Sequence, residues 1–199
     1  MIKRFTVLCI LSIVVFQLEG QTYAPEVWHY GQIITVKGDT VRGKIKYSFI
    51  DDLVQLRNPR TRKVYNAQNI VNVSFTDSIS DELREIKPFN FETAQNFTAP
   101  LLFAIADTIG KYTLLYREYV SEYSSYSPNT GFLTYHKDLE RAFFYKKGNK
   151  VTFLKSRRSA IYKLFADRKV EMKTFIQTNR LNVGRLEDLV KIFRYYNTL

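Results

Sequence analysis

The sequence predicts an α+β protein with an antiparallel, β-rich body, either a sandwich or barrel-like, followed by a small C-terminal helical cap. Through the middle of the 199-residue chain, aromatic and β-branched residues alternate with polar ones. Short turns that contain glycine separate these segments. Beyond Ser156, apolar residues recur at helical spacing instead. We therefore divide the chain into a signal peptide (1–20), an antiparallel β domain (21–155) and a helical cap (156–199) packed on it.

The first twenty residues have the order of features that is typical of a secretory signal peptide. A positively charged start precedes the twelve-residue apolar run Phe5–Phe16, and Gly20 follows as a small residue. This run is too short for a bilayer-spanning helix, which needs about 20 residues. We expect cleavage between Gly20 and Gln21 and a mature chain that is not transmembrane. Cleavage after Ala24 and an uncleaved anchor are the alternatives.

The composition is that of a basic globular protein without cysteine chemistry. The chain carries 30 Lys and Arg against 19 Asp and Glu, a formal net charge of +11. Residues 1–20 hold two basic residues and one acidic residue, so the mature charge is +10. The one cysteine, Cys9, lies in the predicted signal peptide, which excludes disulfides and thiol catalysis from the mature chain. A hydrophobic core must therefore stabilise the exported protein.

The β domain is predicted as a series of hairpins. Gly38 and Asp39 supply a tight turn between two alternating arms, and Pro59 and Gly148 mark two further turns. The predicted strands are Trp28–Val36, Val41–Tyr47, Val54–Arg57, Lys63–Ala67, Ile70–Phe75, Leu101–Ala106, Tyr112–Tyr119, Ala142–Lys146 and Val151–Leu154.

One segment has a pattern that suits both a helix and a strand. Five tyrosines are spaced 4, 3, 4 and 3 residues apart, which suits a helix: Tyr112, Tyr116, Tyr119, Tyr123 and Tyr126. Gly110 and the alternation around Leu114 favour a strand that ends in a loop, and we predict the strand.

The helical cap is predicted from two patterns. Ile161, Leu164 and Phe165 recur at helical spacing, and a short second helix follows around Phe175. The last helix is the clearest, because its apolar residues stand at i, i+3, i+4 and i+7: Leu186, Leu189, Val190 and Phe193.

Two segments resemble a family of uncharacterised exported proteins from Bacteroidota. The opening hairpin GQIITVKGDTVRGKIKY (Gly31–Tyr47) contains the pattern GDT-x-x-G-x-I, and the tail LEDLVKIFRYYN (Leu186–Asn197) is similar to a closing helix that ends in Tyr-Tyr-Asn. The junction at Gly20 is similar to signal cleavage sites in those bacteria. The resemblance implies export and this architecture, and it supplies no catalytic residues.

Candidates for catalysis are few. A packed or surface histidine is the ordinary interpretation of His29. His136, Asp138 and Glu140 alternate, so a strand would project them to one side as an acid/base or metal cluster, but the basic residues around them favour a solvated turn. We predict no catalytic residue, no metal site and no cofactor. An enzyme built from carboxylates that meet only in space stays open.

The basic residues are clustered, which indicates an anionic partner. Seven cations without an intervening acid form the main candidate site: Arg141, Lys146, Lys147, Lys150, Lys155, Arg157 and Arg158. A second run surrounds Pro59: Arg57, Arg60, Arg62 and Lys63. Export makes nucleic acid a poor partner, and anionic lipid, lipopolysaccharide or an envelope protein are the candidates. The alternative is a generally basic soluble surface with no dedicated ligand.

A second candidate site is the tyrosine- and serine-rich segment 119–135. Such a mixture is typical of binding loops, which combine rigid aromatic contacts with adaptable hydrogen bonds. The candidate binding-loop residues are Tyr119, Tyr123, Tyr126 and Tyr135. A long connector without a ligand is the alternative.

Two functions follow from these observations. The first is an exported, periplasmic or extracellular protein of the cell envelope that binds an anionic surface or partner through a basic face and is not an enzyme. The alternative is a barrel-like carrier of an apolar or lipid ligand, which the 14 Tyr and 15 Phe suggest unless they fill the core.

Overall fold

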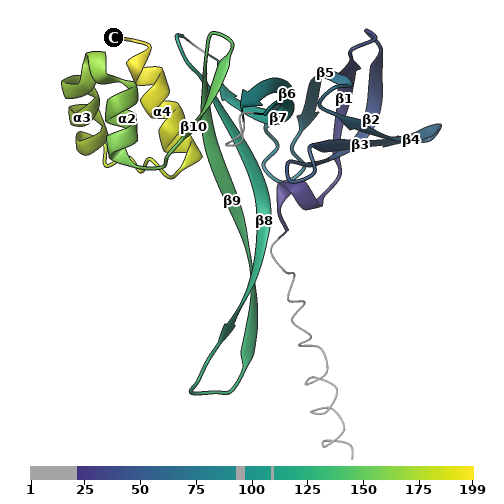
Figure 1. Ribbon diagram of the computed structural model, residues 1–199. Helices are drawn as coiled ribbons and strands as arrows, with labels where there is room; N and C mark the ends of the chain where they lie inside the picture. The colour runs from purple at the N-terminus through teal and green to yellow at the C-terminus, as the bar shows by residue number, and fades with distance from the viewer. Residues whose placement is uncertain (1–21, 93–96, 109) are drawn as a thin grey trace, which may run out of the picture.

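The computed structural model describes residues 22–92, 97–108 and 110–199, so the predicted signal peptide and its cleavage site at Gly20 lie outside the described residues. A ten-stranded antiparallel sheet is followed by three α-helices (Figure 1). This arrangement confirms the predicted α+β, β-rich class. Among the described helices, none is long and apolar enough to cross a membrane.

The strands are β1 (His29–Thr35), β2 (Thr40–Ser48), β3 (Leu53–Asn58), β4 (Thr61–Asn66), β5 (Ile70–Thr76), β6 (Leu83–Glu92), β7 (Thr98–Asp107), β8 (Thr113–Tyr126), β9 (Leu133–Lys147) and β10 (Lys150–Leu154). The helices are α2 (Arg158–Leu164), α3 (Lys169–Thr178) and α4 (Leu186–Tyr196), with short 3₁₀ segments η2 (Ala24–Glu26) and η3 (Ala166–Arg168).

The sheet grows outward from β1 in two directions. Its order is β10-β9-β8-β7-β6-β5-β1-β2-β3-β4, so β2 to β4 form a meander on one side of β1 and β5 to β10 form one on the other. The predicted hairpins β1–β2, β3–β4 and β9–β10 are confirmed. Gly38 and Gly148 hold φ of 87° and 57° in two of these turns, a region that glycine adopts without strain.

The main core lies between one face of the sheet and the helical cap. Its fully buried residues come from both parts, for example Ile45 and Phe143 from strands and Ile192 from α4. Phe165 joins them, because its ring stacks on that of Tyr196 at 4.2 Å between centroids. The cap and the sheet therefore share one hydrophobic core.

A second, smaller core covers the opposite face of β7, β8 and β9. It contains Phe103, Leu115, Phe144 and Val151, with Phe91 packed against it. The sheet curls so that β10 comes back into contact with β6, which closes this core. Since β7 buries both of its faces, its sequence is a near-continuous apolar run rather than an alternating one.

The longest strands, β8 and β9, extend well beyond the rest of the sheet (Figure 1). Their outer parts form a two-stranded ribbon, paired from Tyr119 opposite Glu140 to Tyr126 opposite Leu133, which we call the arm (residues 119–140). The predictions of a loop or connector over 119–135 and of a solvated turn around His136 were therefore wrong. Both faces of the arm are largely exposed, so the arm lacks the one-sided burial whose apolar alternation identifies a strand in the sequence.

Candidate functional site

A buried ionic cluster lies where the arm joins the body. Glu118 on β8 is 1% exposed, and its carboxylate accepts hydrogen bonds from Arg84 of β6 at 2.5 Å and from Arg141 of β9 at 3.1 Å. The hydroxyl of Tyr47 on β2 donates to the same carboxylate. A buried carboxylate with two guanidinium partners and a phenol donor is well compensated. Because these residues come from β2, β6 and the β8–β9 pair, the cluster connects three parts of the sheet.

The cluster continues through Asp77 to the N-terminal segment. The Nε of Arg84 lies 2.8 Å from Asp77, and the His29 ring lies beside the same carboxylate at 3.8 Å. The Nδ1 of His29 accepts from the Ser78 N–H at 3.0 Å, so its Nε2 carries the proton and donates to the Ala24 carbonyl at 2.8 Å. His29 is thus a packed, neutral histidine that fixes η2 against β1.

The phenols of this cluster are held in the protonated state. Burial raises the pKa of Tyr116 to about 12, from an ordinary value of 10.0. Burial and the neighbouring charge of Glu118 raise the pKa of Tyr47 still further. Both side chains are therefore neutral phenols at physiological pH and do not act there as bases, and the Tyr47 hydroxyl donates to Glu118.

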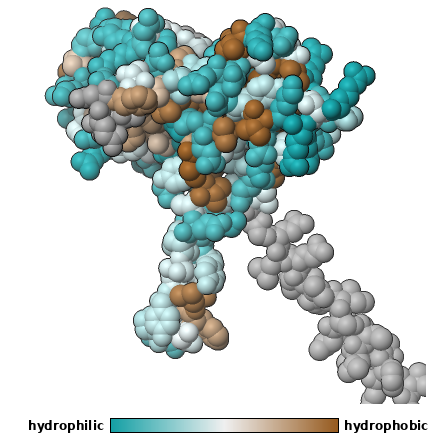
Figure 2. Space-filling model, turned by 45° about the vertical axis from the view of Figure 1, so that its right-hand side comes forward, coloured by the Kyte–Doolittle hydropathy of each residue, from teal (hydrophilic) through white to brown (hydrophobic). Residues whose placement is uncertain are grey.

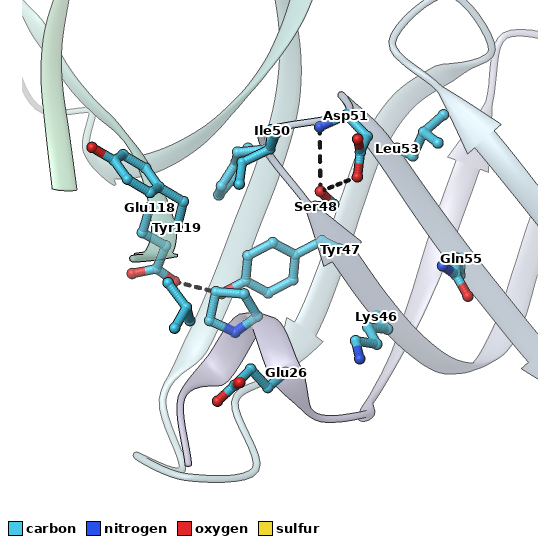
Figure 3. Close-up of a pocket in the computed structure, with 13 residues that line it drawn as sticks. Glu26, Lys46, Tyr47, Ser48, Ile50, Asp51, Leu53, Gln55, Glu118 and Tyr119 are labelled. Carbon is cyan, nitrogen blue, oxygen red and sulfur yellow. Dashed lines mark hydrogen bonds between the residues drawn. The ribbon is translucent and has the colours of Figure 1, made fainter. Parts of the chain in front are cut away.

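A pocket of about 310 Å³ lies beside this cluster, between η2, the β2–β3 turn and β8 (Figure 3). Tyr47 and Glu118 lie on one side of it, and three carboxylates line it in total. Each has a partner: Glu26 pairs with Lys137 at 3.0 Å, Asp51 accepts from Ser48 at 2.7 Å, and Glu118 is held as described above. This pocket therefore lacks the pair of free, convergent carboxylates that would indicate acid/base catalysis.

The three residues that a strand would align as an acid/base cluster, His136, Asp138 and Glu140, do project to one side of the arm. Each contacts a β8 side chain rather than another member of the set: the Tyr119 hydroxyl donates to Glu140 at 2.8 Å and that of Tyr123 to Asp138 at 2.9 Å. His136 stacks on Tyr123. Within the described ranges, no group of three or more His, Cys, Asp or Glu is placed to hold a metal ion.

The structure divides the seven predicted basic-site residues among different surroundings. Arg141 belongs to the buried cluster at the base of the arm. Lys146 and Lys147 are consecutive on β9 and therefore project to opposite faces: the Nζ of Lys146 lies 5.6 Å from the Phe89 ring and that of Lys147 lies 5.8 Å from the Tyr112 ring. The remaining four are exposed at the start of β10 and before or at the start of α2: Lys150, Lys155, Arg157 and Arg158.

Most of the net positive charge lies in the helical cap together with Lys155, the residue that immediately precedes it. Residues 155–199 contain 11 Lys and Arg against 4 Asp and Glu, a net charge of +7 out of the +11 of the whole chain. Three of these cations have acidic partners, Arg168 with Glu171, Lys191 with Asp188 and Arg194 with Asp107. The other eight are exposed and have no ion pair among the described residues: Lys155, Arg157, Arg158, Lys163, Lys169, Lys173, Arg180 and Arg185. We call these eight residues the basic cap.

The four predicted binding-loop tyrosines lie in the arm, but on two faces. Tyr119 and Tyr123 share the face that carries Asp138 and Glu140, where their hydroxyl groups are bonded. Tyr126 and Tyr135 lie on the other face, where they are 64% and 80% exposed. Apolar side chains gather at the end of the arm, where Phe132 and Leu133 are exposed (Figure 2).

Sequence reasoning missed Tyr47, Arg84 and Glu118 as members of one cluster. They are far apart along the chain, and no local spacing connects them. The one available signal is the alternation of β8, in which Glu118 occupies an inward position in line with Leu114 and Tyr116. Comparison of the chain with protein-family models, curated proteins and solved structures gave no match.

Proposed function

We propose that this protein is an exported, non-enzymatic binding protein of the cell envelope and that its basic cap binds an anionic surface. The observation that carries this proposal is the concentration of charge: residues 155–199 hold +7 of the net +11. Eight exposed cations have no acidic partner among the described side chains, so their field is available to a ligand.

The geometry of the cap favours contact with an extended surface. The cap lies at the opposite end of the molecule from the end of the arm (Figure 1). Lys169 and Lys173 are one helical turn apart on α3 and share one of its faces. Each Lys or Arg that approaches an anionic bilayer gains about 1 kcal/mol, so several together bind without a shaped pocket. Phospholipid headgroups and lipopolysaccharide phosphates offer this charge in an envelope.

The carrier alternative is less well supported. The aromatic residues that suggested it largely fill the two cores, as the edge-on contact of Phe103 with Phe144 at 5.1 Å illustrates. The pocket beside Tyr47 is open to solvent and has charged residues in its lining.

Vesicle co-sedimentation tests the proposal. The chain from Gln21 onward is mixed with phosphatidylglycerol vesicles or with phosphatidylcholine vesicles and pelleted at low salt. We expect retention on the anionic vesicles, little retention on the neutral ones, and release as salt screens the charges. Equal retention on both kinds of vesicle would contradict the proposal. A chain that is retained neither on anionic vesicles nor on lipopolysaccharide would contradict it as well.

A further inference from the structure

We propose that two copies of this chain associate through the outer edge of β8 in the arm, so that their arms form one continuous four-stranded ribbon. The outer edge of β8 is the side of Ser121–Tyr126 that faces away from β9. This inference is independent of the basic cap, which lies at the other end of the molecule.

This edge of β8 is open. β9 pairs with β8 along its full length, whereas β7 pairs with it only from Leu114 to Tyr116. The β2–β3 turn lies beside the next residue, because Asp52 forms a salt bridge with Arg117 at 3.0 Å. From Ser121 to Tyr126, no described strand pairs with the outer edge. Six residues leave about 20 Å of unpaired N–H and C=O groups, a template for another strand.

The composition of the edge favours pairing. Protected edges carry lysine, proline or several charges, and residues 119–126 (YVSEYSSY) contain a single charge, Glu122, and no lysine or proline. The other edge of the arm is different, because β9 carries Lys137, Asp138 and Glu140 over a similar length. The pairing edge is therefore that of β8.

The sequence of this edge is complementary to itself. In an antiparallel pair of two copies centred on Tyr123, that residue faces its own counterpart, Glu122 faces Ser124 of the second copy, and Val120 faces Tyr126 of the second copy. Opposed residues in this register lie on the same face, and no like charges meet. A register centred on Glu122 would instead oppose two carboxylates, which is unfavourable. This self-complementary register is the reason that we propose a second copy as the occupant.

The arm also gains stability from such pairing. An isolated two-stranded ribbon is marginally stable in water, and three or more strands are needed for independent stability. Tyr123 and Tyr126 are 51% and 64% exposed in the single chain. Pairing at the β8 edge brings both tyrosines against the second copy and buries part of this surface.

Light scattering coupled to size exclusion tests the proposal on the chain from Gln21 onward. We expect a molar mass twice that of one chain. Tyr123→Lys should halve it, because two lysines then meet at the centre of the interface. Tyr135→Lys is the matched control, an exposed tyrosine on the other strand of the arm, and should leave the mass unchanged. A wild-type chain that is monomeric across a hundredfold range of concentration, or a dimer that survives Tyr123→Lys, would overturn the proposal.

If Tyr123→Lys does not fold, a cross-linking experiment tests whether two copies pair at the β8 edge. The chain from Gln21 onward contains no cysteine, so Tyr123→Cys introduces a single thiol at the centre of the proposed register. Opposed residues of an antiparallel pair lie close enough for a disulfide. Mild oxidation should cross-link Tyr123→Cys rapidly and Tyr135→Cys poorly. Equal rates for the two variants would overturn the proposed register and edge.

Discussion

Arg141 of β9 donates through its Nε to the buried carboxylate of Glu118 on β8 at 3.1 Å. The sequence groups Arg141 with the exposed cations that follow it, and the structure assigns it to a different task. It compensates a buried charge at the base of the arm together with Arg84. The anion-binding surface that we propose therefore begins at Lys155, immediately before the cap, and the ionic cluster serves to fix the arm.

Glu118→Gln should lower the free energy of unfolding by about 3 kcal/mol, because it leaves two partly buried guanidinium groups without their counterion. Urea denaturation followed by circular dichroism measures this change. Glu122→Gln is the matched control, since it removes an exposed carboxylate whose partner is Lys137, and it should have a much smaller effect. Equal effects of the two substitutions would contradict the assigned role of Glu118.

The stability of the protein should fall as the pH rises from about 10 toward 12. Burial raises the pKa of Tyr116 to about 12, so between these values the unfolded chain has lost a proton that the folded chain still holds. The contribution of Tyr116 is therefore fully present below pH 10 and is lost as the pH approaches 12. Urea titrations at several alkaline pH values measure the slope, and Tyr116→Phe should reduce it. If the slope is unchanged in that variant, the loss of stability at alkaline pH comes from other titrating groups, and the role given to Tyr116 is wrong.

Phe165→Ala should destabilise the sheet and the cap together, by about 3 kcal/mol or more. Phe165 is fully buried and contacts Tyr112 before β8, Phe193 of α4 and Tyr196. Far-ultraviolet circular dichroism and tyrosine absorbance should report the same shifted transition, because cap and sheet share a core. Two separate transitions would show that the cap unfolds independently.

Gly31→Ala should destabilise the centre of the sheet. Gly31 lies on β1 opposite Phe75 of β5, and a Cβ at this position would overlap the Ser74 carbonyl oxygen and the Phe75 Cβ. The strands would have to separate, at a cost of about 2 kcal/mol or more. Val36→Ala, at an exposed position just beyond the same strand, is the control. Thermal unfolding of the two variants distinguishes this close approach from a general effect of alanine.

The sequence predicted the elements whose residues repeat with a regular period. The β1–β2 hairpin and α4 are examples, since each buries one face and therefore shows a period of 2 or 3.6 in its apolar residues. The sequence did not predict β6, in which Pro88 interrupts the polar–apolar alternation. It also stopped β8 near Tyr119, because the arm leaves the core there and both of its faces are largely exposed.

Most of the candidate site could be recognised only from the fold, because its residues are far apart in the sequence. Glu118 and Tyr47 are 71 positions apart and meet only because β2 and β8 curl toward one another. The concentration of charge in the cap could be counted from the sequence, but which cations have no acidic partner depends on contacts such as that of Arg194 with Asp107, 87 positions apart.

The measurement that tests the central proposal most directly is the affinity of two matched triple variants for phosphatidylglycerol vesicles. One variant replaces Lys155, Arg157 and Arg158 of the basic cap with glutamine, and the other replaces Arg60, Arg62 and Lys63 at the β3–β4 turn. All six residues are exposed, and each variant loses three charges. We predict that the cap variant binds about a hundredfold more weakly at low salt, while the turn variant binds nearly as the wild type does. Equal weakening of both would show that net charge, and not the cap, is responsible for binding.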